Sequence, residues 1–367
     1  MPAINVFAFN AFSVWLRTLR ANPAIKPKYW PKLTNFLTTS LLTEPFRAYE
    51  KARYGAIIHN VQIDPEPLFI MGMARSGTTH LHNLLAQDPN YGYVTTLQGV
   101  APGFVISSGP WLRRLIQRFL PKTRPMDNVA ISLDAPQEEE VAIANSCPHS
   151  FIYHLAFPQQ AVTYFERYHL WQGVDENIRA EWRATYLHVL RVATYLSGGK
   201  PLVLKSPANS GRVPQLLEMF PNARFIHIYR DPLRTYLSHR NMITKILPPH
   251  QLQDMTMDEM EGLILQFMQR AAEKWLQDRQ LIPGDRIVDV RYEDLTANPL
   301  TELQRIYDTL GLPVQQVLPR WQAYLQTLKG YKRNAFVPHP SDVAKVRQHL
   351  GFLYEKWAYP LPDVVGE

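Results

Sequence analysis

Two short segments of the sequence place glycine, hydroxyl and arginine residues at spacings that can hold an anion. The first follows an apolar run at 67–71 and contains, in order, Gly72, Arg75, Ser76, Gly77, Thr78 and Thr79. A glycine-containing turn between a strand and a helix presents several backbone N–H groups to one anion, and the helix N-terminus adds a partial positive charge. We therefore predict an anion-binding loop in which Arg75 makes bidentate contacts.

This loop differs from the phosphate loop of nucleotide hydrolases at one position. Such loops read G-x-x-x-x-G-K-[ST], and their lysine reaches the terminal phosphates. Gly72 and Gly77 have the required spacing, but Thr78 stands where the lysine would be. Triphosphate hydrolysis is therefore disfavoured, and a small-molecule kinase is kept only as an alternative function.

An arginine and a serine eight positions apart form the second candidate site. The run "RFIHIYR" at 224–230 is typical of a strand, and the residues that follow have a helical pattern. Arg230 then leaves the end of the strand, while Ser238 lies about two turns along the helix. If the loop folds back, both side chains can bracket one phosphate.

Together, the two segments resemble the signatures of sulfotransferases that use 3′-phosphoadenosine 5′-phosphosulfate (PAPS). "RSGTT" after an apolar strand is similar to the loop that binds the 5′-phosphosulfate, and Arg230 with Ser238 matches the 3′-phosphate signature. The similarity extends from about residue 45 to residue 358 and includes "RPMDNVAISLDAPQEEEVAI" and "VRYEDLTANP". It implies sulfuryl transfer from PAPS without a metal ion.

The resemblance also implies roles for several individual residues. Arg75 and the amides of 76–79 would stabilise the leaving phosphate, and Lys205, which ends an apolar run, would neutralise the sulfuryl oxygens. His80 stands where cytosolic members carry an adenine-stacking tryptophan. The stretch "LKGYKRNAF" at 328–336 is similar to a basic loop that closes over the adenine and 3′-phosphate, which makes Lys332 and Arg333 cofactor-binding candidates.

The general base is not fixed by the resemblance. Pro207 stands where cytosolic members have a catalytic histidine, and "YVTTLQG" at 93–99 lacks the glutamate of the tyrosine-protein branch. Three adjacent acids at 138–140 begin a helical pattern, and one helix face cannot direct all three into a pocket. We predict that Glu138 or Glu140 is the base. The alternatives are His80, His82 and His149. A PAPS-binding protein without catalysis also stays open.

The elements that must position these residues follow an alternating pattern. Apolar runs and helical stretches alternate through 200–242, which is typical of parallel βαβ units. We expect strands at 67–71, 202–204, 224–230 and 286–292, and helices at 44–59, 138–146, 161–169, 176–197, 210–219, 257–279, 300–310 and 314–326. The family fold implied is α/β, a P-loop NTPase-like parallel sheet flanked by helices, with ligands at the carboxyl ends of the strands.

The ends of the chain suggest one domain with an extension. We interpret residues 1–60 as a helical extension packed on the domain, and residues 61–367 as a single sulfotransferase α/β domain with further helices in its middle. The apolar segment at 5–16 is too short to span a bilayer and lacks a basic signal-peptide start. It is either a helix packed on the domain, which we favour, or an amphipathic helix on a membrane. We expect a cytoplasmic protein, with peripheral membrane contact as an option.

Composition restricts the partners only broadly. The chain is 46% hydrophobic, with a net charge of +7 and a pI of about 9.3, which favours acidic ligands. No nucleic-acid-binding motif is present, so we expect no nucleic-acid partner. A single cysteine, Cys147, excludes an internal disulfide. The acceptor stays open between a phenol or other small molecule, a lipid and a glycan. Aromatic candidates to line its pocket are Phe104, Trp111, Phe151, Tyr153 and Phe157.

Overall fold

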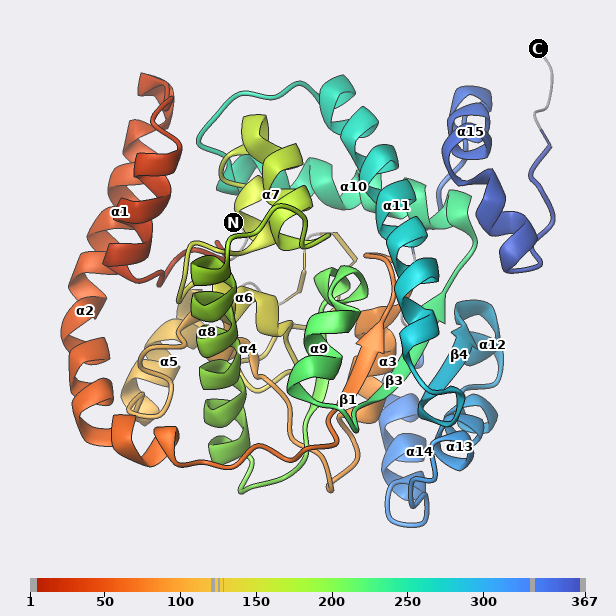
Figure 1. Ribbon diagram of the computed structural model, residues 1–367, viewed down its shortest axis with the longest axis horizontal. Helices are drawn as coiled ribbons and strands as arrows, with labels where there is room; N and C mark the ends of the chain where they lie inside the picture. The colour runs from red at the N-terminus through yellow and green to blue at the C-terminus, as the bar shows by residue number, and fades with distance from the viewer. Residues whose placement is uncertain (1–4, 120–122, 125, 128, 331–333, 364–367) are drawn as a thin grey trace.

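A four-stranded parallel sheet forms the centre of the molecule (Figure 1). The structure is a computed structural model that describes residues 5–119, 123–124, 126–127, 129–330 and 334–363. The strands lie in the order β2-β1-β3-β4, with bounds β1 Leu68–Met71, β2 Val203–Lys205, β3 Arg224–Tyr229 and β4 Ile287–Arg291. The predicted α/β fold with a parallel sheet is confirmed, and each strand lies where the sequence indicated.

The register brings the carboxyl ends of three strands to one edge. Leu68 of β1 pairs with Val203 of β2 and with Arg224 of β3, and all these pairings are parallel. Parallel strands that are covered on both faces read as continuous apolar runs, as "LFIM" in β1 does. Gly72, Lys205 and Arg230 therefore lie where β1, β2 and β3 end.

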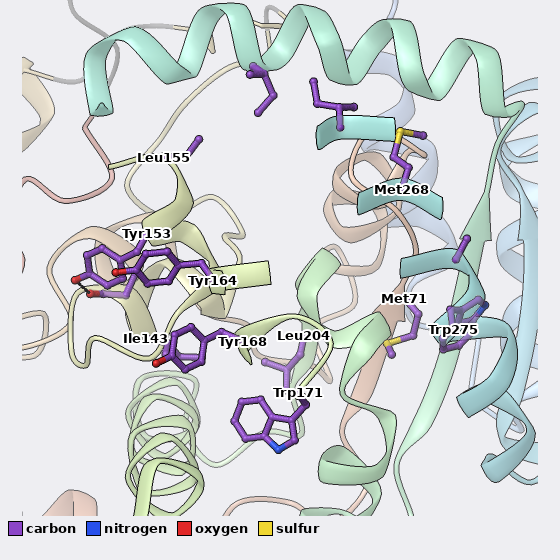
Figure 2. Packing of buried hydrophobic residues seen from close by; sticks show 14 of the residues in the cluster. Met71, Ile143, Tyr153, Leu155, Tyr164, Tyr168, Trp171, Leu204, Met268 and Trp275 are labelled. Carbon is purple, nitrogen blue, oxygen red and sulfur yellow. Dashed lines mark hydrogen bonds between the residues drawn. The ribbon is translucent and has the colours of Figure 1, made fainter. Parts of the chain in front are cut away.

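Helices cover both faces of the sheet. The helical segments that follow the four strands are α3 Thr78–Leu85, η4 Pro207–Gly211, α9 Val213–Met219, α10 Pro232–His250, α11 Met257–Asp278, η5 Arg279–Leu281, η6 Gly284–Arg286, α12 Tyr292–Ala297, α13 Pro299–Thr309, α14 Leu318–Thr327 and α15 Pro340–Lys356. Side chains of β1 alternate between two cores. Ile70 packs with Trp321 in one core, while Met71 shares the other with Met268 and Trp275 of α11 (Figure 2).

A helical layer at the N-terminus packs into the larger core. It consists of α1 Phe12–Ala21, η1 Pro27–Tyr29 and α2 Trp30–His59. Phe7 and Trp15 are fully buried and belong to the same apolar cluster as Phe69 of β1. The 5–16 segment therefore packs on the domain, and these aromatic side chains are not available to a membrane. The boundary at residue 60 stays an interpretation, because this layer shares the core of the sheet.

The chain between β1 and β2 forms a further helical layer. Its elements are α4 Thr96–Val100, α5 Pro110–Phe119, α6 Glu139–Ala144, η2 Phe151–His154, η3 Pro158–Gln160, α7 Ala161–Tyr168 and α8 Glu176–Leu196. Tyr153 and Tyr164 pack against each other, with ring centroids 6.0 Å apart, in the large core (Figure 2). Across the described ranges, we find no helix with both the length and the apolar character needed to cross a bilayer.

Candidate active site at the carboxyl edge of the sheet

The loop after β1 has a backbone that only particular residues can adopt. Gly72 has a φ of 147°, Arg75 of 73° and Gly77 of 105°. A Cβ on Gly72 would lie 2.4 Å from the carbonyl oxygen of Ile228, and one on Gly77 would lie 2.3 Å from the ring of Tyr292. A loop with several positive-φ residues shortly before a helix can form a concave backbone that binds an anion. The two glycines are thus required by the close approach of β3 and α12.

The residues of the loop divide into those that build it and those that begin the helix. The Ser76 hydroxyl lies 2.8 Å from the carbonyl oxygen of Met73 and 3.1 Å from that of Ile228, so this side chain holds the loop onto β3. The helix α3 begins at Thr78, and the first amides of an α-helix have no carbonyl partner within it. Thr78, Thr79 and His80 form this first turn, which is the part suited to an anion.

The two predicted phosphate signatures meet in space. Arg75 Nε donates a hydrogen bond of 3.1 Å to Ser238 Oγ, across 163 positions of sequence. Arg230 Nη1 donates one of 3.4 Å to the carbonyl oxygen of Arg75. The guanidinium of Arg230 lies 4.5 Å from the ring centroid of Tyr292, a cation–π contact that orients it. Arg75, Arg230 and Ser238 thus form one cluster, and their role in binding a phosphate stays a prediction.

The sequence interpretation missed an acidic residue in this cluster. Asp127 Oδ2 accepts a hydrogen bond of 2.7 Å from Arg75 Nη1 and one of 3.0 Å from Arg124 Nη2. Arg124 and Asp127 belong to the stretch "RPMDN". This stretch was seen to resemble the family, but no role was predicted for these two side chains. Tyr292 was missed as well, although its position directly after β4 places it at the same edge of the sheet.

The predicted basic loop lies partly beyond the described residues. Lys332 and Arg333 are outside them, so their positions stay a prediction. The next residue, Asn334, donates a 2.8 Å hydrogen bond from Nδ2 to the carbonyl oxygen of Met126. Met126 is the neighbour of Asp127, and it lines the cavity described below. The chain at Asn334 therefore contacts the segment that carries Asp127, a partner of Arg75.

Lys205 and Glu138 form a buried pair close to the loop. Lys205 ends β2 with a side chain that is 3% exposed, and its Nζ lies 2.5 Å from Glu138 Oε1 and 3.5 Å from Thr79 Oγ1. Burial lowers the pKa of Lys205, and the attraction of Glu138 opposes that shift. Glu138 immediately precedes α6, and its side chain is 29% exposed. A carboxylate and an ammonium group thus stand together beside the anion loop.

The two acids after Glu138 have different environments. Glu139 is fully buried and accepts hydrogen bonds from the Lys205 amide and from Asn209, and burial raises its pKa. Glu140 forms a buried ion pair with Arg212 at 2.6 Å, and its other oxygen accepts the Ser150 hydroxyl hydrogen bond at 2.7 Å. Both oxygens of Glu140 are therefore engaged. Glu138 and Glu140 both line the cavity described below, but the contacts of Glu140 disfavour it as a base and leave Glu138 as the better candidate.

Two of the three alternative histidines have other surroundings. His149 lies 3.0 Å from Glu181 and 3.1 Å from Tyr168, and it does not line the cavity found in the described residues. His82 is buried on α3, where desolvation and the charge of Lys205 lower its pKa to about 3. His80, the third alternative, is half-buried in the first turn of the same helix.

A cavity of about 330 Å³ extends from the loop into the helical layers. Gly72, Thr79, Glu138 and Lys205 line one end of it. Apolar residues of α10 and α11 line much of the remainder, among them Met242, Ile243, Ile264, Phe267, Met268 and Ala271, together with apolar residues of the chain between β1 and β2. Of the aromatic candidates, Phe151 lines the cavity, whereas Phe104, Tyr153 and Phe157 are buried in the cores; the side chain of Trp111 is outside the description.

Histidines in the cavity wall are uncharged at neutral pH. Burial lowers the pKa of His154 and His250 to about 4, and that of His169 and His239 to about 3. All four line the cavity beside apolar side chains. The wall formed by these rings therefore carries no charge from them, in contrast to Lys205 and Glu138, which line the cavity beside the loop. Among the described residues, no group of three or more His, Cys, Asp or Glu could hold a metal ion.

Comparison with known proteins identifies the family. A family model described as the sulfotransferase family matches residues 67–316. The chain belongs to the sulfotransferase family. A curated relative, omega-hydroxy-beta-dihydromenaquinone-9 sulfotransferase Stf3 of Mycobacterium bovis, is 31% identical over 351 residues, which cover 95% of this chain and 89% of the relative. The Mycobacterium tuberculosis protein of the same name matches to the same extent. The protein is therefore an enzyme of the sulfotransferase class.

Solved structures of mycobacterial sulfotransferases share the fold. STF9 from Mycobacterium avium has a TM-score of 0.71 at 20% identity, with 94% of this chain and 89% of that chain covered. STF1 from Mycobacterium tuberculosis H37Rv has a TM-score of 0.66 at 18% identity, with 94% and 90% covered. At these identities, the two structures show that the fold is shared. Because 94% of this chain is covered, the shared fold includes the helical layers outside the sheet.

Proposed function

We propose that the enzyme moves a sulfuryl group from PAPS to a hydroxyl group at the end of an apolar, lipid-like acceptor. The observation that carries this proposal is the continuity of one cavity. Its charged end holds the anion loop, Lys205 and Glu138, and its other end is lined by apolar side chains of α10 and α11. An acceptor whose hydroxyl group reaches Glu138 would place its hydrocarbon part between those helices.

The donor would be held by the arginine cluster. The amides at the start of α3 and Arg75 suit the 5′-phosphosulfate, because both offer donors to an anion. Arg230 and Ser238 suit the 3′-phosphate, and their contacts with Arg75 support a single ligand that spans both signatures. His80 would contact the adenine, and Lys332 with Arg333 would close over the nucleotide. Ser76 contributes by holding the loop in shape.

The chemical step we propose is an in-line transfer with Glu138 as the base. The acceptor oxygen forms a bond to sulfur, the bond between sulfur and the bridging phosphate oxygen breaks, and Glu138 takes the acceptor proton. Lys205 offsets charge on the sulfuryl oxygens, and Arg75 offsets charge on the leaving phosphate. The Glu138–Lys205 pair beside the loop favours catalysis over a binding-only role, and Thr78 in place of a lysine disfavours a kinase.

The lipid-like nature of the acceptor rests on two independent observations. The curated relative is named for an ω-hydroxylated menaquinone, which is a hydroxyl-bearing lipid. In this chain, the wall beyond Glu138 is formed by residues such as Ile243, Phe267 and Met268. The apolar wall does not fit a charged glycan, because the polar groups of the glycan would have no hydrogen-bond partners there. A lipid alcohol is therefore the acceptor class that we propose.

A chain-length series of acceptors tests this function. The enzyme would be incubated with ³⁵S-labelled PAPS and primary alcohols of increasing length, and the labelled sulfate ester would be measured. Each added methylene that enters the cavity should raise kcat/KM by roughly fourfold, from about 0.8 kcal/mol of apolar burial, until the cavity is filled. Absence of turnover at every length, or a rate independent of length, would contradict the proposed acceptor. Calorimetry with 3′-phosphoadenosine 5′-phosphate (PAP) tests the donor site separately.

A further inference from the structure

The helix α2 exposes many apolar residues, while several of its buried residues are polar. Two adjacent stripes at helical spacing face solvent: Leu41, Pro45, Ala48, Ala52 and Ala56 in one, and Leu42, Phe46, Tyr49, Arg53 and Ile57 in the other. Leu42 is 68% exposed and Tyr49 is 60% exposed. Such a wide apolar stripe normally faces the core of a protein. We call these two stripes the outer face of α2.

The inner side of the same helix is mixed in character. Its buried residues are Phe36, Ser40, Thr43, Glu50 and Ile58. The Glu50 carboxylate accepts hydrogen bonds from the amide and the hydroxyl group of Ser107, at 2.6 and 2.8 Å. These contacts fix the rotation of the helix about its axis. The exposure of the outer face is therefore built into the packing of α2, which lies at the periphery of the molecule (Figure 1).

The exposed charges on this part of α2 are mostly positive. Lys51 and Arg53 are exposed and Glu50 is buried, while the Glu44 side chain, which is 38% exposed, lies 3.7 Å from Arg47. The neighbouring helix α5, whose Leu112 and Ile116 pack in one apolar cluster with Tyr54 and Ile58 of α2, adds exposed Arg114 and Arg118. An apolar face on which exposed basic residues outnumber acids is typical of helices that lie in the surface of an anionic bilayer.

We propose that the outer face of α2 docks the enzyme on an anionic lipid bilayer, with the helix lying in the plane of the surface. A second copy of the chain fits this face less well, because two such faces would bring Lys51 and Arg53 of each copy against like charges. This inference goes beyond the sulfotransferase reaction, and its test measures binding rather than turnover. Failure of one proposal is thus distinguishable from failure of the other.

Vesicle flotation tests the proposal. The full chain is expected to float with phosphatidylcholine vesicles that contain 30% phosphatidylglycerol, and to bind pure phosphatidylcholine vesicles at least about tenfold more weakly, because each basic residue near an anionic surface adds attraction. The double variant Leu42→Gln/Tyr49→Gln should weaken binding to the anionic vesicles by about tenfold or more. The matched control Leu281→Gln changes an equally exposed leucine, at 56% exposure, on η5, and should bind as the wild type does.

A second variant separates docking from folding. Lys51→Glu/Arg53→Glu changes only exposed side chains, and should reduce binding to anionic vesicles by about tenfold or more while leaving the thermal unfolding midpoint unchanged. Two results would overturn the proposal. One is an absence of specific binding: either the wild-type protein floats with neither type of vesicle, or both double variants bind anionic vesicles as tightly as the wild type does. The other is a dimer in analytical ultracentrifugation that Leu42→Gln/Tyr49→Gln converts to monomer, which would assign this face to a second copy.

Discussion

The two ends of the cavity are built in different ways. The charged end is assembled from strand ends and the loop after β1, where Lys205 Nζ lies 3.5 Å from Thr79 Oγ1. Arg75 and Arg230 follow the same edge of the sheet, and Arg230 donates a hydrogen bond to the carbonyl oxygen of Arg75. The other end lies between the long helices α10 and α11 and contains apolar residues and uncharged histidines. The difference suggests that the sheet edge fixes the donor and the transfer step, while the helical layers select the acceptor. Changes at each end should therefore alter different measured quantities.

The largest expected effect is at the boundary between the two ends. Glu138→Gln removes the proposed base but keeps the size of the side chain, so kcat should fall by about 10²- to 10⁴-fold. The Kd for PAP should stay within about threefold, because the arginine cluster is unchanged. Single-turnover rates and calorimetry on the same preparation measure the two quantities. Near-normal kcat in this variant would remove Glu138 from the mechanism.

Glu140→Gln is the matched control, since it makes the same change two residues away. Here the expected loss is in stability, because Arg212 would keep a buried charge without its partner. Breaking such a pair costs about 3–5 kcal/mol of unfolding free energy, which urea unfolding would detect. A stable Glu140→Gln enzyme that had lost its turnover would instead make Glu140 the base and reverse our assignment.

The next effect isolates the donor end. Arg230→Ala should weaken PAP binding by roughly 10²- to 10³-fold, since hydrogen bonds between charged groups contribute about 1.5–3 kcal/mol each. Isothermal titration calorimetry measures this change directly. Arg320→Ala is the control, because Arg320 is an exposed arginine on α14 that does not line the cavity. Equal affinities in the two variants would separate Arg230 from the nucleotide site.

A smaller effect isolates the acceptor end. Ala271 lies on α11, is 8% exposed and lines the cavity, so Ala271→Leu fills part of the space proposed for the hydrocarbon chain. We expect kcat/KM for long alcohols to fall by about tenfold, with short alcohols and PAP binding little affected, because lost methylene contacts are worth about 0.8 kcal/mol each. Gln266→Leu adds the same side chain at an exposed position of the same helix. A loss of similar size in both variants would show a general effect on α11.

The difference between the two ends of the cavity also explains which parts of the site the sequence could predict. Gly72, Arg75 and Gly77 form a local motif whose spacing follows from the geometry of a turn, and Arg230 follows a strand with a clear pattern. The apolar end has no such signature, because Ile243 and Met268 read as ordinary helix residues, and only tertiary packing makes them face a cavity. The three acids at 138–140 formed one charge run in the sequence. Their separate partners depend on Arg212 and Lys205, which lie about 70 positions further along the chain.

The last expected effect is in the dependence of stability on pH, and it belongs to the apolar end. His154 and His250 have pKa values lowered to about 4, and His169 and His239 to about 3, whereas an unfolded histidine titrates near 6.5. Below pH 6.5, the unfolded chain therefore binds more protons than the folded one. The stabilisation is complete above pH 6.5 and declines as the pH falls towards these lowered values.

Each such ring should reduce the unfolding free energy by up to about 1.4 kcal/mol per pH unit in this window. His169→Phe tests this slope, because His169 packs against Phe151 and Phe165, and neither of its ring nitrogens has a hydrogen-bond partner within the described structure. Urea unfolding at pH 7, 6 and 5 should give a shallower decline in this variant than in the wild type. His59→Phe, at an exposed position, should leave the decline unchanged. Equal slopes in all three proteins would mean that His169 takes up a proton in the folded state, and the acceptor end would then be charged rather than neutral in weak acid.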